Sequence, residues 1–318
     1  MTATTWGYAL SSEEHRPSDM VRYARQAEDA GFGFIGISDH FHPWTDSQGE
    51  SPFVWSVLGG IAEATERIKL ITGVTAPIIR THPAIIAQAA ATTADMMPGR
   101  FSLGVGSGEA LNEHIFGDRW PPADVRLEML EEAIAVIRLL WQGGSQSHEG
   151  KHYCVENARI YTLPDELPPI VVAAGGEKAA SLAGRCGDGL MSTSPESDVI
   201  RAWSDAGGTG PKYAQVTVLW HEDEATAKKM ALELWPNGGV TGQLSQDLPT
   251  PAHFEQAAEM VDEDAVGKKV VCGPDVGKHV AMIDKYRDAG FDHIYLHQVG
   301  PDQEGFFRFW DKELSGRL

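Results

Sequence analysis

The sequence is poor in cysteine and has no long hydrophobic run. Its three cysteines, Cys154, Cys186 and Cys272, are far apart and form no CxxC pair, so neither a disulfide framework nor a cysteine-ligated metal is expected. No stretch approaches the roughly 18 apolar residues of a transmembrane helix. The N-terminal segment lacks a basic stretch followed by an apolar core, so no secretory signal is expected. These absences predict a cytoplasmic protein with reduced thiols.

Basic residues are few relative to acidic ones. Lys and Arg number 26 against 45 Asp and Glu, which gives a formal net charge of −19. A surface of that sign repels phosphate backbones and anionic lipids, which excludes a general nucleic-acid or membrane binder. With 42% hydrophobic residues the chain is expected to fold, and it contains no interdomain linker. We therefore expect one domain over residues 1–318, with irregular insertions near 142–168 and 236–262.

Short apolar runs alternate with helical patterns along almost the whole chain. Between residues 124 and 141, for example, apolar residues recur every three or four positions, which is typical of a helix with one buried face. Continuous apolar strands separated by helices are typical of a parallel sheet covered by helices. About eight such units predict an α/β fold, a closed (β/α)8 TIM barrel, with a doubly wound open sheet as the alternative. The expected strands are 5–10, 32–38, 68–74, 101–105, 168–174, 188–193, 213–220, 268–273 and 292–299.

A barrel of this kind carries its active site on the loops that follow the C-terminal ends of the strands. Acidic, basic, aromatic and glycine-rich groups stand at several of these points and should converge on one face. The segments are SDHFHPW (38–44), GVTAP (73–77), GVGSGEALN (104–112), AGG (174–176) and STS (192–194).

The first of these segments contains a candidate general base. His40 titrates near neutral pH, and the neighbouring carboxylate of Asp39 can orient an imidazole or bind a ligand hydroxyl. Both residues could instead cap the next helix, and Trp44 could be ordinary loop packing. His42 adds a second imidazole, but no third ligand is evident, so no metal site is expected.

The glycine-rich segments suggest a ligand that approaches the backbone closely. Residues 104–112 do not form a dinucleotide fingerprint, because Glu109 stands where the third glycine would be required. Glycines still admit a flat ring or a phosphate, and Glu109 suits a proton donor, although it could simply be an acidic residue at a helix start. Gly175 and Gly176 precede an expected helix, whose first N–H groups could hold a phosphate.

Five longer stretches together carry a family resemblance. They are SDHFHPW (38–44), LITGVTAPIIRTHPAIIAQAAAT (70–92), GRFSLGVGSGEALNEHIFG (99–117), VVAAGGEKAASLAGRCGDGL (171–190) and DHIYLHQVGPDQEGFFRFW (292–310). In this order they resemble the luciferase-like flavin and deazaflavin oxidoreductases, and most closely the F420-dependent glucose-6-phosphate dehydrogenases. The resemblance implies a TIM barrel, often a homodimer, that binds coenzyme F420 at the C-terminal face.

The resemblance also implies roles for individual residues. His40 would take the hydroxyl proton of an alcohol as hydride moves to C5 of the coenzyme, Glu109 would supply a proton to the reduced ring, and Trp44 would stabilise the developing charge. A cis peptide bond between Gly73 and Val74 is implied as well. The implied cofactor contacts are Asp39, Gly73, Val74, Ala76, Gly106, Ser107, Gly108, Asn112, Ala174, Gly175, Gly176 and Thr193.

The sequence departs from the family where a sugar phosphate would be bound. Family members carry a lysine shortly after the sixth strand, but here Glu196 and Asp198 lie in that region and the first basic residue is Arg201. The stretch 236–250, where the family supplies a second lysine, contains no basic residue. A phosphomonoester would meet repulsion there in place of charge-assisted hydrogen bonds.

We therefore expect an F420-dependent dehydrogenase that acts on a neutral sugar or another small alcohol. One alternative is glucose-6-phosphate oxidation, with Lys268 or Lys269 holding the phosphate. Another is a monooxygenase that uses flavin mononucleotide, for which a strongly basic phosphate pocket would be the sign. A third is a catalytically silent barrel, which the set of Asp39, His40, Trp44 and Glu109 argues against.

Overall fold

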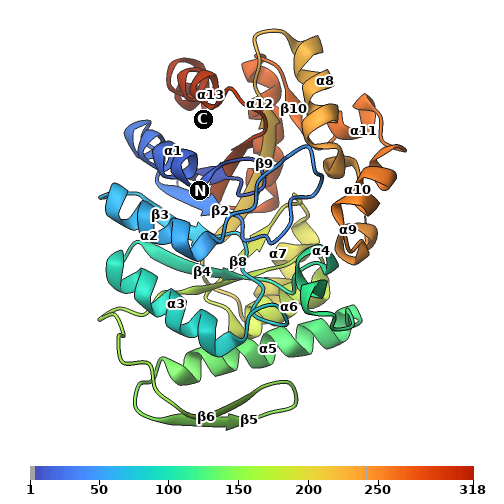
Figure 1. The fold of residues 1–318 in the computed structure, drawn as a ribbon. Coiled ribbons are helices and arrows are strands. Elements are labelled where there is room, and N and C mark those ends of the chain that lie inside the picture. Colours follow the sequence, from blue (N-terminus) through green and yellow to red (C-terminus); the bar gives the residue numbers. More distant parts are fainter. Residues whose placement is uncertain (1–3, 241) are drawn as a thin grey trace.

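In residues 4–240 and 242–318, which the computed structural model describes, eight parallel strands close into a barrel covered by helices (Figure 1). The last strand pairs with the first, since Tyr8 lies opposite Leu296, and the predicted closed barrel is therefore confirmed over the open sheet. In barrel order the strands are β1 (Thr5–Leu10), β2 (Phe34–Ile37), β3 (Lys69–Thr72), β4 (Phe101–Val105), β7 (Ile170–Ala173), β8 (Gly189–Ser192), β9 (Lys212–Leu219) and β11 (His293–Gln298).

The helices follow the expected pattern, with small shifts at their ends. Proline occupies the first turn of α1 and of α3, where a missing N–H costs nothing. Helix α5 begins at Ala123, so Asp124 lies in its first turn and is not its cap. The principal helices are α1 (Pro17–Asp29), α2 (Val54–Ala64), α3 (Pro83–Met96), α5 (Ala123–Leu140), α6 (Glu177–Cys186), α7 (Ser197–Asp205), α8 (Glu224–Leu234), α12 (Val276–Ala289) and α13 (Gln303–Phe309).

One expected strand is not part of the barrel. Of residues 268–273 only Val271–Cys272 form a strand, β10, and it pairs with the far end of β9 alone. Strand β9 is longer than its neighbours, so its end extends past the barrel and can pair with β10. The apolar run predicted a strand correctly but could not show which strand it would join.

The two irregular regions both contain structure. The first forms an antiparallel hairpin, β5 (Gln146–Glu149) and β6 (Cys154–Ala158), at the bottom of Figure 1. In the second, the helix that starts at Pro251 ends at Ala258. Asp262 caps a new short helix, accepting a hydrogen bond from the Ala265 N–H. The elements of this region are η2 (Pro236–Gly239), α9 (Leu244–Asp247), α10 (Pro251–Ala258) and α11 (Glu263–Gly267), on the right of Figure 1.

Large aromatic side chains fill the barrel interior near the N-terminal ends of the strands. Phe34, Tyr213 and Tyr295 pack together there and are buried. Gly36 has no side chain because a Cβ atom would lie 2.8 Å from the Tyr295 ring. No helix of the described residues is long and apolar enough to span a bilayer.

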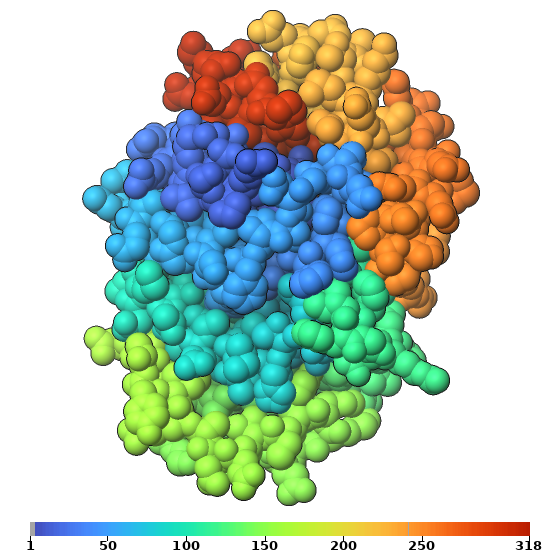
Figure 2. Space-filling model, in the orientation of Figure 1, coloured from blue at the N-terminus to red at the C-terminus, as the bar shows by residue number. Residues whose placement is uncertain are grey.

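The surface in Figure 2 shows how the chain is distributed over one face. The N-terminal segments (blue) lie in the middle, the C-terminal segments (red) above them, and the region near residue 150 below. The remaining short turns are α4 (Ala110–Glu113), η1 (His114–Phe116), η3 (Trp310–Leu314) and η4 (Ser315–Arg317). Of these, α4 follows β4 directly and therefore stands at the C-terminal mouth of the barrel, where the predicted site lies.

Candidate active site

The loop after β2 places His40 and Trp44 against each other. Their ring centroids lie 4.9 Å apart at an angle of 60°, and His40 is only 9% exposed. Helix α2 does not start until Val54, with Phe53 as its N-terminal residue outside the helix, so neither Asp39 nor His40 caps it. The alternative that Asp39 and His40 cap the next helix is therefore wrong.

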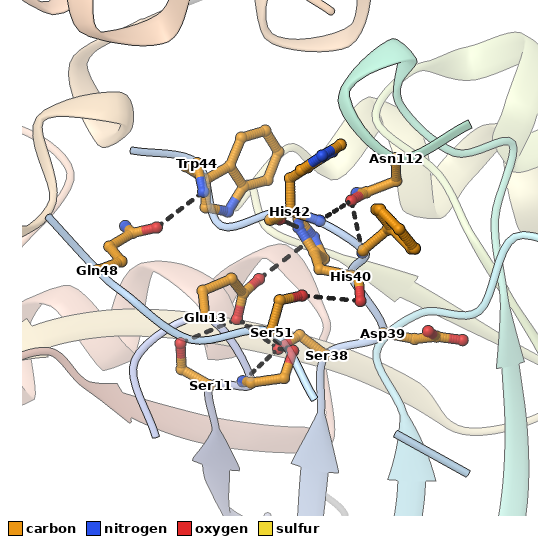
Figure 3. A network of polar contacts seen from close by, with 12 residues as sticks. Ser11, Glu13, Ser38, Asp39, His40, His42, Trp44, Gln48, Ser51 and Asn112 are labelled. Atoms are coloured by element: carbon orange, nitrogen blue, oxygen red, sulfur yellow. Dashed lines mark hydrogen bonds and ion pairs between the residues drawn. The ribbon is translucent and has the colours of Figure 1, made fainter. Parts of the chain in front are cut away.

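A carboxylate that the sequence analysis missed faces His40. Glu13, in the loop after β1, lies with its Oε1 3.2 Å from Nε2 of His40 and is 3% exposed (Figure 3). Its Oε2 accepts hydrogen bonds from the hydroxyls of Ser38 (2.6 Å) and Ser11 (2.9 Å). The position after the first strand is itself a strand end, which was the available signal, but the run Ser11-Ser12-Glu13-Glu14 has the composition of a solvated loop.

The surroundings of Glu13 favour its charged form. Burial by itself would raise the pKa of Glu13, but the charge of His40 and the hydrogen bonds from Ser38 and Ser11 outweigh burial and hold that pKa below its ordinary value. Glu13 is therefore an anion at neutral pH. An imidazole proton on Nε2 of His40 has this anion as its acceptor.

Asp39 belongs to a second buried network, and Figure 3 shows it pointing away from the Glu13–His40 pair. Its carboxylate accepts hydrogen bonds from Arg80 Nη2 (2.8 Å) and from the Thr75 hydroxyl (2.7 Å). Glu113 accepts the backbone N–H groups of Ile79 and Arg80, at 3.2 and 2.7 Å. The network thus ties together the loops that follow β2, β3 and β4.

Within this network the pKa of Glu113 is raised. Burial raises the pKa of Glu113 to about 7, because loss of hydration outweighs its hydrogen bonds and the nearby charge of Arg80. Its carboxylate Oε1 lies 3.5 Å from Nε of Arg80. Glu113 therefore titrates in the neutral range while holding the loop of Arg80 in place.

Asn112 fixes the loop that carries His40. Its Oδ1 accepts the backbone N–H groups of Phe41 (2.8 Å) and His42 (3.1 Å). The Nδ2 group of Asn112 is buried, and among the described residues it has no hydrogen-bond partner. A buried donor without a partner costs free energy, so this amide is suited to donate to a bound ligand.

Glu109 stands at the start of α4 but does not cap it. It occupies the N-cap position, yet its side chain makes no capping hydrogen bond, and it is half-buried. Glu109 therefore does stand at a helix start, as the structural alternative expected, but its side chain caps no N–H group there. Its carboxyl group remains available at the mouth of the barrel.

The glycines after β4 are required by protein contacts. A Cβ atom at Gly106 would lie 2.6 Å from Cγ2 of Val74, and Gly108 has a φ of +66° with Ala76 3.0 Å from its Cβ position. The peptide bond between Gly73 and Val74 is cis, as the family resemblance implied. Side chains of the β3 loop, and not an open ligand space, thus account for these two glycines, while Ser107 between them is half-buried.

The loops after β7 and β8 are more open. Ala174 is buried, but a Cβ atom at Gly175 or Gly176 would meet nothing within 4 Å. Gly176 precedes α6 without a side-chain cap, so the first N–H groups of this helix are free to bind an anion. Thr193 is exposed, and its carbonyl accepts the Tyr286 hydroxyl at 3.0 Å.

The second irregular region packs over Trp44. Phe254 of α10 lies edge-on to the Trp44 ring, with centroids 5.1 Å apart. The Gln48 side chain accepts the backbone N–H of Trp44 (2.9 Å), and the Glu255 side chain accepts the backbone N–H of Asp46 (3.0 Å). Through Phe254 and Glu255, helix α10 therefore holds the loop of His40 in place.

His42 does not act as a partner of His40. Its Nδ1 lies 2.8 Å from the carbonyl oxygen of Leu111, and its ring packs against His114. Over the part of the chain that the structure describes, no cluster of three or more His, Cys, Asp and Glu residues could hold a metal ion.

These features define the class of the protein. A buried imidazole–carboxylate pair at the C-terminal mouth of a parallel (β/α)8 barrel is typical of TIM-barrel enzymes.

Comparisons with known proteins identify the family. Residues 1–293 match the family model of luciferase-like monooxygenases. An F420-dependent glucose-6-phosphate dehydrogenase of Microbacterium testaceum is 36% identical over 98% of this chain and 97% of its own, and one of Mycobacterium avium is 34% identical over the same shares. The solved structure of an F420-dependent secondary alcohol dehydrogenase in complex with an F420-acetone adduct superposes over 100% of both chains, with a TM-score of 0.92 and 29% identity. The chain belongs to the luciferase-like monooxygenase family.

Proposed function

We propose that this protein is an F420-dependent dehydrogenase that oxidises the CH–OH group of a neutral sugar or another alcohol. The observation that carries the proposal is the buried contact between Glu13 and His40 beside Trp44, because alcohol oxidation needs a base whose positive charge is compensated. The similar proteins named above act on a sugar phosphate and on a secondary alcohol, and both are named as F420-dependent.

The residues at the mouth fit the coenzyme. Val74 is half-exposed at the rim, the Nδ2 group of Asn112 is a buried donor without a described partner, and the uncapped start of α6 after Gly176 suits a phosphate group. When bound, the deazaflavin supplies the carbon, C5, that accepts the hydride. We propose that the remaining contacts come from Asp39, Gly73, Ala76, Gly106, Ser107, Gly108, Ala174, Gly175 and Thr193.

His40 takes the hydroxyl proton in this mechanism. In the neutral ring, Nδ1–H donates to the carbonyl oxygen of His42, 3.2 Å away, so Nε2 is the nitrogen that accepts the proton as hydride leaves the same alcohol. Once protonated, Nε2–H donates to the carboxylate of Glu13. Glu13 and the Trp44 ring then stabilise the positive charge, and the alcohol becomes a carbonyl compound.

Glu109 would donate a second proton, which would neutralise the charge that the coenzyme gains on reduction. Glu109→Gln should therefore slow hydride transfer by roughly 10²-fold, while coenzyme affinity changes much less, because glutamine keeps the size of the side chain but cannot release a proton. Stopped-flow absorbance and fluorescence titration measure the two quantities. Hydride transfer at the wild-type rate would make Glu109 a binding residue only.

Charge near the mouth supports a substrate without a phosphate group. Glu196 and Asp198 stand at the start of α7, directly after β8. The first cation there, Arg201, is paired with Asp198 at 3.0 Å, so its charge is already compensated. Lys268 and Lys269 are exposed and follow α11.

A substrate screen tests both the activity and this preference. We expect the wild-type protein to reduce F420 with a neutral alcohol or sugar at a higher kcat/KM than with the phosphorylated sugar. Glu196→Lys should shift that ratio about tenfold toward the phosphosugar, because a repulsive charge becomes attractive near a solvated pocket mouth. Glu156→Lys, on the hairpin, changes the charge equally and should leave the ratio unchanged.

Two outcomes would contradict these proposals. Reduction of F420 by none of the alcohols would remove the activity itself. If the wild-type protein prefers glucose 6-phosphate to glucose, other cations must bind the phosphate. Lys268 and Lys269 would then be the first residues to replace.

We further propose that residues 1–318 form one luciferase-like domain and that two such chains form a homodimer. We also propose that the protein is cytoplasmic. The faces of α2 and α3 support the dimer. Phe53, Ile85 and Met96 are 62%, 57% and 39% exposed there, in a chain that otherwise carries a large net charge. Three unpaired thiols are consistent with a reducing compartment. Light scattering of the purified protein measures the number of subunits.

A further inference from the structure

Strand β9 presents two polar side chains to the barrel interior. Its residues alternate, so Ala214, Val216 and Val218 pack outward under the helices while Tyr213, Gln215 and Thr217 face inward. Tyr213 is buried among the interior aromatic residues, whereas Gln215 and Thr217 are partly exposed. An inward side chain of a closed barrel meets solvent at the mouth, so these two residues stand on the side of the proposed active site.

Gln215 is held in one orientation by a second imidazole–carboxylate pair. Nε2 of His297, on β11, lies 2.9 Å from the Oε2 atom of Glu14, and Nδ1 of His297 lies 3.4 Å from Nε2 of Gln215. The Glu14 carboxylate also accepts the Gly300 N–H at 3.1 Å. Trp235 packs edge-on against the His297 ring, at 4.6 Å between centroids. His297 and Glu14 are both buried.

Hydrogen-bond chemistry then determines which end of the amide faces the cavity. A carboxylate only accepts, so His297 carries a proton on Nε2, and in the neutral imidazole Nδ1 is then the acceptor. The NH₂ group of Gln215 donates to that Nδ1, which leaves its Oε1 directed elsewhere. Within residues 4–240 and 242–318, Oε1 of Gln215 has no hydrogen-bond partner.

Gln215 lies across the mouth from His40. Strands β11 and β1 separate β9 from β2, whose loop carries His40, in the order of the barrel. Ser192 of β8 pairs with Ala214, so Thr193 and Gln215 are the next residues on neighbouring strands. A substrate that places one hydroxyl at His40 can therefore extend toward Gln215.

We propose that Gln215 is a substrate-binding residue whose Oε1 accepts a hydrogen bond from a second hydroxyl of the substrate, and that Glu14 and His297 are positioning residues for it. The proposal rests on the proposed function and narrows its substrate to uncharged polyhydroxylated compounds, such as sugars and polyols. A simple monohydroxy alcohol has no second donor and gains nothing from this residue.

The test compares a neutral sugar with 2-propanol. Gln215→Leu keeps the size of the side chain but removes the acceptor, so kcat/KM for the sugar should fall roughly tenfold, the usual effect of losing one hydrogen bond. kcat/KM for 2-propanol and the dissociation constant of F420 should change less than about twofold. Gln142→Leu, at an exposed position directly after α5, is the matched control and should change none of these quantities.

A second variant tests the positioning residues. Glu14→Gln removes the charge that fixes the proton on His297, and we expect it to raise KM for the sugar severalfold without changing kcat for 2-propanol. A residue with a purely structural role would affect both substrates together. Thermal unfolding of each variant shows whether the fold is kept.

Binding without turnover separates this proposal from the proposed function. With the reduced coenzyme, which cannot accept hydride, the dissociation constant of the sugar should rise about tenfold in Gln215→Leu. An equal loss for sugar and 2-propanol, or unchanged sugar binding, would overturn the role of Gln215. Failure of the wild-type protein to oxidise either alcohol, with the sugar still bound through Gln215, would overturn the dehydrogenase activity alone.

Discussion

His40→Ala should lower kcat for alcohol oxidation by roughly 10²–10⁴, the range expected when a general base is lost. Without the imidazole, water would have to take the hydroxyl proton. Affinity for F420 should change much less, because the ring of His40 contacts Glu13 and Trp44 and is assigned to the alcohol. Steady-state kinetics and coenzyme titration measure both effects.

His42→Ala is the matched control for that experiment. It removes an imidazole from the same loop, but one that contacts the carbonyl of Leu111 and not Glu13. Its effect on kcat should be far smaller than that of His40→Ala. If turnover in His40→Ala stays near that of the wild-type protein, His40 has no part in the mechanism.

Glu13→Gln should have the second largest effect, a fall in kcat of roughly 10²-fold. An amide keeps the size of the side chain, but it cannot compensate the charge that His40 acquires. Glu14→Gln, one residue further, makes the same chemical change beside His297 and should leave kcat for a simple alcohol unchanged. A similar fall in kcat in both variants would show that kcat depends on the integrity of the loop and not on the contact between Glu13 and His40.

The pH dependence of stability gives an independent measurement on Glu13. Its pKa is lower in the folded chain than in the unfolded one, so its charged form contributes stability above the unfolded value. That contribution is lost as the pH falls through the depressed pKa. Chemical denaturation at several acidic pH values should show a smaller loss of unfolding free energy for Glu13→Gln than for the wild-type protein.

Residues in the same family motif turned out to have different structural roles. The strand-end argument placed Asp39, His40 and Glu109 at one face, and the structure brings them to the mouth of the barrel. It also shows that Asp39 bonds to Arg80 while His40 pairs with Glu13. Neighbouring positions in a loop point in different directions, and a sequence does not say which partner each will meet.

The sequence by itself determined a parallel sheet covered by helices. Alternating apolar runs and helical patterns make sense only if each strand is buried on both sides, and the proline and glycine positions place most helix ends within a few residues. These features are local, so they can be recognised without knowing what packs against them. The polar segments after the strands follow from the same pattern.

Only the tertiary structure decided the contacts between distant segments. β10 pairs outside the barrel because β9 happens to be longer than its neighbours, and Gly106 is needed because Val74 occupies the space beside it. Glu13 looked like part of a solvated acidic loop until closure of the barrel placed it between Ser38 and His40. Burial and partner, which set the charge state of a carboxylate, arise from closure of the barrel and not from the residues beside it in the chain.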